Sequence, residues 1–337
     1  MVSFSRQKTL QICRDFYSCR CVDDPKTTNK NVFIELTNRC NFNCDFCYYR
    51  FSKRSKRFMS MRLLEKALKD LKNSGMDVSY VMFSHLGEPM LHPKFREACL
   101  LVKKYGFRLV VTTNGSLLNG GVNDLPIDEL YISFHTPNKK SFKLRHAGSM
   151  KFYDYKKSVM NFAASSRMPT CIYLFKKNDT LPMLEGFFDI KSKKSVGEVE
   201  RIVRNICPSF DVRKSYNENE SPIPLSHNLS LRFRNLQSFC NTIIPDGMVV
   251  VDASSIPRCS CYIHHINILS DGTVTFCCGD MDGSMSTGNI EKEHLHKIYA
   301  RRKPGADLSK YPFCRRCRGT LVSAGNLRTQ PSLTCAR

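Results

Sequence analysis

The feature that most restricts the fold of this chain is an alternation of short, β-branched apolar runs with amphipathic helical patterns over its first two thirds. The predicted strands are residues 32–36, 78–83, 108–112, 130–134 and 171–175. The predicted helices between them are residues 61–73, 95–105 and 153–164. Such an alternation predicts a parallel sheet with helices outside, and the active sites of these folds lie at the carboxyl ends of the strands. Functional residues are therefore expected directly after the strands.

The sequence pattern changes after this region. Residues 206–256 contain many turn-forming Pro, Asn and Ser residues and show no sustained period. The run INILSDGTVTFC that follows, at 266–277, has the alternation and the Asp-Gly turn typical of a β-hairpin. We therefore expect four parts, which are an N-terminal extension (1–29), an α/β core (30–205), a connecting segment (206–256) and a small cysteine-rich domain (257–337).

Composition limits the class of protein. With 42% hydrophobic and 24% charged residues in a chain of 337, the sequence is globular rather than disordered or fibrous. No apolar run approaches the roughly 18 residues of a membrane span, and charges interrupt the first hydrophobic stretch, so we expect a cytoplasmic protein without a membrane partner. The formal net charge of +22 predicts an anionic partner, but it does not choose among nucleic acid, acidic peptide, phosphorylated metabolite and membrane surface.

The chain has 17 cysteines, an odd number without an export signal, which favours metal or cluster ligation over disulfides. Cys40, Cys44 and Cys47 follow the first predicted strand in TNRCNFNCDFCYY. Thiolates are preferred ligands of iron–sulfur clusters, and a C-x3-C-x2-C loop can bind three irons of a [4Fe–4S] cluster and leave the fourth open. The alternative is a structural zinc site, which normally uses four protein ligands in C-x2-C pairs.

With this loop after its first strand, the sequence resembles the radical S-adenosylmethionine (SAM) superfamily over roughly residues 30–205. The resemblance implies a partial (β/α)6 barrel of the TIM kind, in which Cys40, Cys44 and Cys47 bind a [4Fe–4S] cluster whose open iron binds exchangeable SAM. It also implies a low-potential electron donor, such as a flavodoxin or ferredoxin. In that family the reduced cluster cleaves SAM to a 5′-deoxyadenosyl radical, which abstracts hydrogen from the substrate.

The resemblance also implies a set of SAM-binding residues. HLGEP at 85–89 is similar to the family's GGEP, with Leu86 in place of the first glycine, and TTNG and KLRHAG match further elements. A bidentate arginine is chemically suited to the SAM carboxylate. The implied residues are Phe46 at the adenine, Gly87 and Glu88 at the amino group, Thr113 and Asn114 at the ribose or methionine, Ser133 at the end of the fourth strand, and Arg145 at the carboxylate.

A second group of cysteines surrounds the predicted hairpin. Together with DGTV, CCGD and GNI, these cysteines resemble the SPASM/twitch extension of radical SAM enzymes, which implies an auxiliary [4Fe–4S] cluster. A zinc ribbon is the alternative. The expected ligands are Cys259, Cys277, Cys314 and Cys317, with Cys261 open as a replacement for Cys259 and Cys278 as a replacement for Cys277.

The ten other cysteines fit mostly as packing residues, because free cysteine is among the most buried residue types. Cys240 is a candidate hydrogen-atom donor, since radical SAM epimerases use such a thiol. The stretch with Cys13, Cys19 and Cys21 could bind a further cluster, although loop cysteines are the simpler interpretation.

Relatives with this layout modify ribosomally made peptides by crosslinking, epimerisation or oxidation, and we expect a peptide substrate because a basic surface suits an acidic leader. The alternative is a dehydrogenase or epimerase of a small polar metabolite such as an aminocyclitol sugar. A third class, a nucleic-acid-binding protein with structural metal sites, is suggested by RFSKRSKRFMSMR at 50–62, which has six basic residues and no acid. A solvated loop is the simpler interpretation of that run.

Overall fold

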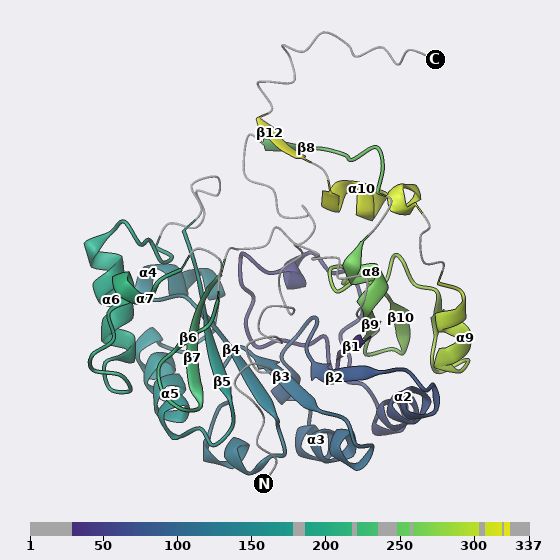
Figure 1. Cartoon of the computed structure of the whole chain (residues 1–337), viewed down its shortest axis with the longest axis horizontal. Coiled ribbons are helices and arrows are strands. Elements are labelled where there is room, and N and C mark those ends of the chain that lie inside the picture. The colour runs from purple at the N-terminus through teal and green to yellow at the C-terminus, as the bar shows by residue number, and fades with distance from the viewer. Residues whose placement is uncertain are drawn as a thin grey trace.

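The computed structural model describes residues 29–177, 186–217, 221–234, 248–256, 259–302, 307–318 and 320–323. Its main element is a curved sheet with the strand order β11-β10-β9-β1-β2-β3-β4-β5-β7-β6 (Figure 1). Parallel pairing from β1 to β7 brings the carboxyl ends of these strands to one edge. The parallel strands are β1 (Lys30–Ile34), β2 (Val78–Phe83), β3 (Leu109–Thr113), β4 (Glu129–His135), β5 (Thr170–Phe175) and β7 (Leu229–Arg234).

Helices cover the outer face of this sheet (Figure 1). In the first of them, Ser60 Oγ accepts a hydrogen bond from Leu63 N at 3.2 Å and so caps the amino end. Its leucines share one buried face, and Gly75 follows its carboxyl end at φ +66°. The covering helices are α2 (Met61–Asn73), α3 (Phe95–Lys104), α5 (Phe152–Ser165) and α6 (Lys193–Val203), and the first three lie within a residue of their predicted bounds.

Side chains alternate between the two faces of the sheet. Val81 and Phe83 of β2 belong to the large apolar core beneath the helices, while Tyr80 and Met82 point to the concave inner face. The inner apolar cluster is small and consists of Phe33, Tyr80, Met82, Val110, Tyr131, Cys171 and Tyr173. The remaining inner positions are largely polar, so the interior of the barrel is suited to binding.

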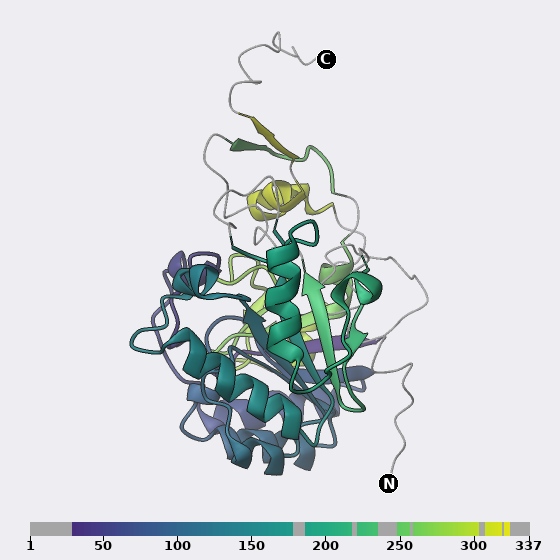
Figure 2. The same cartoon turned by 90° about the vertical axis from the view of Figure 1, so that its left-hand side faces the viewer.

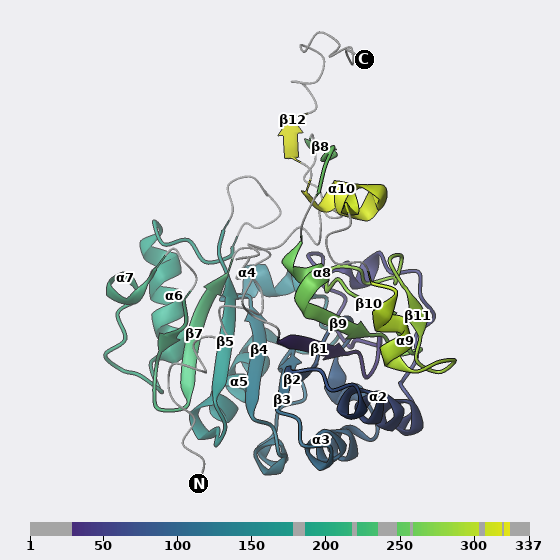
Figure 3. The same cartoon turned by 45° about the vertical axis from the view of Figure 1, so that its right-hand side comes forward.

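Two features of the sheet go beyond the sequence prediction. β7 lies within the range 206–256, which was expected only to connect two domains, and it pairs in parallel with β5. The predicted hairpin forms as β9 (His265–Ile268) and β10 (Thr273–Thr275), with Gly272 at φ +84° in its turn. Because β9 also pairs in parallel with β1, the hairpin continues the barrel sheet (Figure 3). The division of the chain into four parts stays a prediction, and its first 28 residues lie outside the described ranges.

The remaining elements are short. In Figures 1 and 2, α10 and the β8–β12 pair project beyond the barrel on one side. These elements are α4 (Lys139–Phe142), α7 (Val212–Ser215), β6 (Ile223–Pro224), β8 (Met248–Val251), α8 (Ser260–His264), β11 (Gly288–Asn289), α9 (Leu295–Ala300), α10 (Pro312–Arg318) and β12 (Thr320–Ser323).

Within the described ranges, the structure contains no helix with both the length and the apolar composition that a bilayer crossing requires.

A buried ion pair joins the barrel to the hairpin. Arg54, from the basic run, donates two hydrogen bonds to the Glu35 carboxylate, at 3.0 and 2.5 Å. Ser270, at the hairpin turn, donates to the same carboxylate from its backbone N and its Oγ, at 3.1 and 2.7 Å. Burial alone would raise the pKa of Glu35, but the neighbouring His85, whose Nδ1 lies 3.7 Å away, and the hydrogen bonds from Arg54 outweigh burial and hold that pKa at about 2. The carboxylate is therefore charged at neutral pH, and it fixes three segments that are remote in sequence.

We predict that Glu35→Gln lowers the free energy of unfolding by about 3 kcal/mol, because it removes the main counter-charge of the largely buried Arg54 guanidinium and leaves Asp282, at 4.0 Å, as its remaining ion-pair partner. Because the folded pKa of Glu35 lies below its unfolded value, the stabilisation from its charge is present above about pH 4.5 and is lost as the pH falls toward about 2. Chemical denaturation followed by circular dichroism measures the change.

Arg62→Ala is the matched control, since its ion pair with Glu291 lies at the surface, where charge pairs contribute little. Equal destabilisation by both substitutions would show that the buried pair has no special role.

Candidate active site

The first cysteine loop follows β1, at the edge where the parallel strands end. Its three thiols lie close enough for the charges of Cys44 and Cys40 to act on Cys47. Phe42 N donates to Cys40 Sγ and Tyr49 N donates to Cys47 Sγ, each at 3.4 Å. Backbone donors of this kind stabilise the negative charge of thiolates at iron–sulfur sites.

Burial dominates the titration of these thiols. It raises the pKa of Cys40 to about 11 and that of Cys47 to about 12, and it also raises the pKa of Cys44. Such thiols become thiolates at neutral pH when a metal replaces their protons. Within the described ranges, the one set of three ligands spaced for a single metal ion lies elsewhere, so the wider spacing of this triplet fits a cluster better than zinc.

Glu88 lies beside this loop at the end of β2 and is buried. Its carboxylate accepts hydrogen bonds from Thr113 Oγ1 at 2.9 Å, from Asn114 N at 2.6 Å and from Met90 N at 3.1 Å. Burial raises the pKa of Glu88 to about 7 despite these donors. A cationic partner such as an ammonium group would stabilise the charged form of this carboxylate and lower its pKa.

The position before Glu88, Gly87, must be glycine for steric reasons. It lies at φ +86°, and a Cβ there would come within 2.4 Å of the Thr37 carbonyl oxygen and 2.7 Å of the Arg39 carbonyl oxygen. Glu88 N donates to that Arg39 oxygen at 2.8 Å. The close approach therefore attaches the GEP turn to the cysteine loop. Leu86, which departs from the family motif, is simply buried.

Asn114 bridges the turn and the loop. Its Nδ2 donates to Asn41 Oδ1 at 2.8 Å and lies 3.8 Å from Cys40 Sγ. The structure thus brings Thr113, Asn114 and Glu88 together beside Cys40, as the sequence order suggested.

Arg145 is held by acceptors from the protein itself. Its Nη1 donates to the carbonyl oxygens of Ser133 and Phe134 and to Tyr155 Oη, at 2.7–2.8 Å. The side chain is only 1% exposed, and it also hydrogen-bonds the Cys44 thiol. Arg145 therefore supports the cysteine loop through these contacts, and its expected contact with a SAM carboxylate stays a prediction.

Phe46 enters an aromatic cluster at the mouth of the barrel. Its ring contacts Phe175, Phe187 and His135 edge-on, with centroid distances of 5.5, 5.6 and 6.0 Å. Ser133 lies on the same inner face of β4 as His135 and is half-buried. The three phenylalanine rings bury one another almost completely, and the expected contact of Phe46 with adenine stays a prediction.

Sequence reasoning missed three inner residues, which are His135, Arg232 and Arg234. His135 stacks on Phe175 at 3.8 Å, and burial together with the charges of Arg145 and Arg234 holds its pKa well below the usual range. The imidazole is therefore neutral. The arginines pair in register with Tyr173 and Phe175, so they share the inner face. The alternation in LRFR was the signal that could have identified them.

The second cysteine group gathers beside the hairpin. Burial raises the pKa of Cys314 to about 12, and the charges of Cys277, Cys259 and Cys317 raise it further, so the four thiols lie near one another. Cys314 and Cys317 lie one turn apart on α10, and Gly279 N donates to Cys277 Sγ at 3.4 Å. This set fits a four-thiolate cluster.

Asp280 shapes the loop behind Cys277. Its carboxylate accepts hydrogen bonds from Thr275 Oγ1, from the backbone N and Oγ of Ser284 and from Met285 N, at 2.7–2.9 Å. This explains structurally why CCGD ends in an acid. Cys240, the expected hydrogen donor, lies outside the described residues, as do Cys13, Cys19 and Cys21.

Two protein-family models match the chain. The radical SAM superfamily matches residues 34–182, and the SPASM iron–sulfur cluster-binding domain matches residues 259–318. These ranges hold the first cysteine loop and the hairpin group.

Curated relatives share parts of the chain. A protein of Pyrococcus furiosus described as a tungsten-containing aldehyde ferredoxin oxidoreductase cofactor-modifying protein is 32% identical over 108 residues, which is 31% of this chain and 30% of that protein. The match to this relative therefore spans less than a third of its length. An uncharacterized protein of Methanocaldococcus jannaschii is 29% identical over 286 residues, 82% of this chain and 85% of that protein.

Among solved structures, Streptococcus suis SuiB bound to its precursor peptide SuiA has a TM-score of 0.51 and 13% sequence identity. The alignment covers 91% of this chain and 68% of SuiB. At this identity the likeness concerns the fold.

We predict that Cys277→Ser lowers the iron content of the anaerobically reconstituted protein by about four per chain, whereas Cys278→Ser leaves it unchanged. The reason is that Cys314, an expected cluster ligand, lies near Cys277 and Cys259. These two are the favoured members of the pairs Cys277/Cys278 and Cys259/Cys261. Iron and acid-labile sulfide assays measure the difference, and loss of iron in Cys278→Ser alone would reverse the assignment.

Proposed function

This chain belongs to the radical SAM superfamily and carries a C-terminal SPASM iron–sulfur domain. From the residues of its site, we propose that it modifies a ribosomally made peptide by crosslinking, epimerisation or oxidation. The cofactors of these domains are a [4Fe–4S] cluster with SAM and auxiliary iron–sulfur clusters. When bound, they supply a 5′-deoxyadenosyl radical that abstracts a hydrogen atom. The rest of the proposal concerns what the residues of this chain do.

We assign Cys40, Cys44 and Cys47 to the SAM cluster, because their thiols face one another and receive backbone N–H donors. Glu88 would accept the SAM ammonium, which supplies the positive charge that its buried carboxylate lacks. The remaining SAM contacts are proposed for Phe46, Gly87, Thr113, Asn114, Ser133 and Arg145, and Arg145 also lies beside Cys44.

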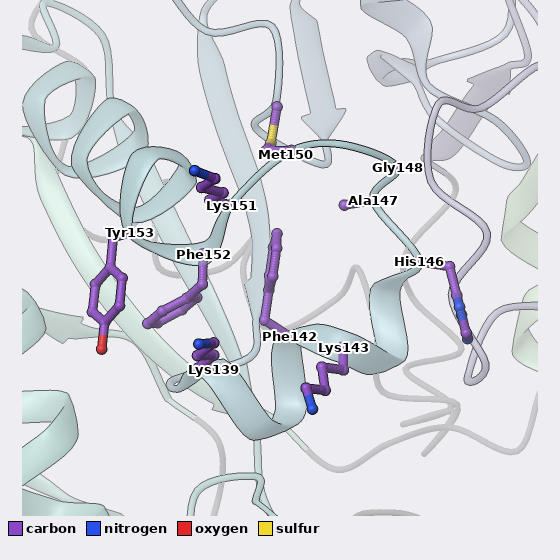
Figure 4. Close-up of a pocket in the computed structure, with 10 residues that line it drawn as sticks. All are labelled: Lys139, Phe142, Lys143, His146, Ala147, Gly148, Met150, Lys151, Phe152 and Tyr153. Atoms are coloured by element: carbon purple, nitrogen blue, oxygen red, sulfur yellow. The ribbon is translucent and has the colours of Figure 1, made fainter.

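The observation that carries the peptide proposal is a basic depression beside the cysteine loop. Figure 4 shows Lys139, Lys143 and Lys151 around Phe142 and Phe152, and no acidic side chain lines this pocket. A neighbouring pocket continues it past α6 with more lysines than acids. An extended groove of lysines and aromatic rings fits an acidic peptide with apolar side chains better than a small metabolite.

This depression connects directly to the cluster loop. Asp45 N donates to the Leu144 carbonyl at 2.8 Å, and the Asp45 carboxylate lies 2.9 Å from His146 Nε2. A peptide held along the groove would therefore lie beside the segment that carries the three cysteines. The SuiB fold, which is known with a bound precursor peptide, supports the idea that a barrel of this kind can accommodate one.

The interior of the barrel favours an anionic group on the substrate. Arg232 is 3% exposed, and its Nε and Nη1 have no hydrogen-bond partner among the described residues. Arg234 lies over the Tyr173 ring on the same face, and neutral His135 is nearby. An acidic side chain would satisfy these donors, whereas the amine of an aminocyclitol sugar would meet like charge.

The nucleic-acid alternative loses its main support. Part of the basic run at 50–62 is engaged within the protein, where Arg54 binds Glu35 and the backbone of the run is held by Thr37 and Asn38. Lys56 lies 3.7 Å from the centre of the Tyr49 ring. These groups are less available to phosphates than the sequence suggests.

We predict that Cys44→Ala abolishes formation of 5′-deoxyadenosine, and that Glu88→Gln weakens SAM binding roughly 10- to 100-fold by removing a charge-assisted hydrogen bond of about 1.5–3 kcal/mol. Anaerobic chromatography of the reduced, reconstituted protein measures product, and calorimetry measures SAM affinity. Cys99→Ala, at a buried position in α3, is the control. Sustained cleavage by Cys44→Ala would contradict the assignment.

We predict that the triple variant Lys139→Gln, Lys143→Gln and Lys151→Gln binds a fluorescein-labelled Glu/Leu peptide about tenfold more weakly than the unmodified protein, since each lysine contributes a modest attraction. Fluorescence anisotropy at two salt concentrations measures the affinity.

The control carries the same loss of charge at Lys69, Lys72 and Lys104, which lie exposed on α2 and α3. If both triple variants lose affinity equally, the groove is not the docking site and general charge explains the binding.

A further inference from the structure

The second members of the two ambiguous cysteine pairs form a separate group. Cys261, His265 and Cys278 each direct one ligand atom into a common space, and these atoms all lie within 4.8 Å of one another. Cys261 and His265 are buried, and Cys278 is partly buried. The set is therefore distinct from the cysteines whose charges act on Cys314.

Local structure explains why these three residues meet. Cys261 lies in α8 and His265 follows it by four positions, the spacing that places side chains on one side of a helical turn. β10 runs antiparallel to β9, with Thr275 opposite Asn267, so the residues after β10 return toward His265. Three neighbouring segments, α8, β9 and the residues after β10, thus supply two thiols and one imidazole.

The surroundings hold these ligands in place. Arg302 Nη1 donates to the carbonyl oxygens of Tyr262 and Ile263, at 2.9 and 2.6 Å, and so fixes the turn between Cys261 and His265. The His265 ring packs against Phe33 with a centroid distance of 4.9 Å. Ligands whose orientation is fixed by a second layer of contacts are typical of metal sites.

The spacing selects the kind of metal. Around a tetrahedral zinc ion, with Zn–S of about 2.3 Å and Zn–N of about 2.0–2.1 Å, ligand atoms lie roughly 3.5–3.8 Å apart. A [4Fe–4S] cluster stands between its thiolates and needs a wider set. Two thiolates also neutralise a divalent cation, which lowers the free-energy cost of burying the ion.

We propose that Cys261, His265 and Cys278 bind a single zinc ion, beside and separate from the auxiliary cluster. No fourth Cys, His, Asp or Glu of the described ranges joins the set, so water completes the tetrahedron. The ion ties α8 and β9 to the end of β10. Cys259 and Cys277 lie within two residues of zinc ligands, so the ion positions both for the auxiliary cluster.

The test uses the full chain, reconstituted anaerobically with iron and sulfide and then given one equivalent of zinc chloride. After desalting, mass spectrometry of the metals should find about one zinc per chain, and zinc-edge X-ray absorption should find two sulfur neighbours at about 2.3 Å and one imidazole nitrogen at about 2.0 Å. The absorption spectrum needs no variant, so it tests the site even if a substitution prevents folding.

Cys261→Ser and His265→Asn should each reduce retained zinc at least fivefold and leave iron and sulfide unchanged, whereas Cys171→Ser, a buried cysteine on β5, should retain zinc. Zinc with only nitrogen and oxygen neighbours, or a Cys261–Cys278 disulfide in the anaerobic protein, would overturn the proposal. Loss of about four irons in Cys261→Ser would also overturn it, because Cys261 would then be a cluster ligand. SAM cleavage is not a readout, so the outcome is independent of the proposed function.

Discussion

The ion pair between Glu35 and Arg54 is the contact on which the arrangement of the site depends. It is buried at the end of the first strand, where an unpaired charge would be strongly unfavourable, so both side chains and the Ser270 turn must occupy one place. The segment after the cysteine loop and the C-terminal hairpin are thereby attached to the same strand end. The hydrogen bonds of Asp282 with Tyr48 and Ser52 continue this attachment.

Charge in the barrel is arranged around what the protein binds. The thiols and the carboxyl of Glu88 have raised pKa values because burial outweighs their hydrogen-bond donors and the nearby charge of Arg145. The opposite imbalance holds on β7, where buried arginines outnumber acids. On the inner face, acids and thiols therefore gather at the cysteine loop and arginines gather on β7, and this separation of charge underlies our proposal of an acidic peptide substrate.

Much of the fold could be predicted because its signals are local. α2 begins and ends at the predicted residues, since a cap, an apolar face and a glycine coincide there. β7 was missed because Leu229–Arg234 carries arginines at alternate positions, a pattern that reads as polar until the inner face of the barrel is known. His135 was missed because its neutral, stacked state depends on Phe175 and on arginines from other strands.

The sequence by itself determined the order of the motifs and the local spacing of the first three cysteines, because strand, loop and ligand lie within a few residues. It also determined the hairpin, through alternation and a glycine turn. The sequence favoured Cys277 over Cys278 as a cluster ligand, but only the tertiary structure decided which neighbours each one meets, since the charge of Cys277 acts on Cys314 and the thiol of Cys278 lies beside His265. It likewise decided that Arg145 supports the cysteine loop, because its acceptors come from residues that are adjacent only in the folded chain.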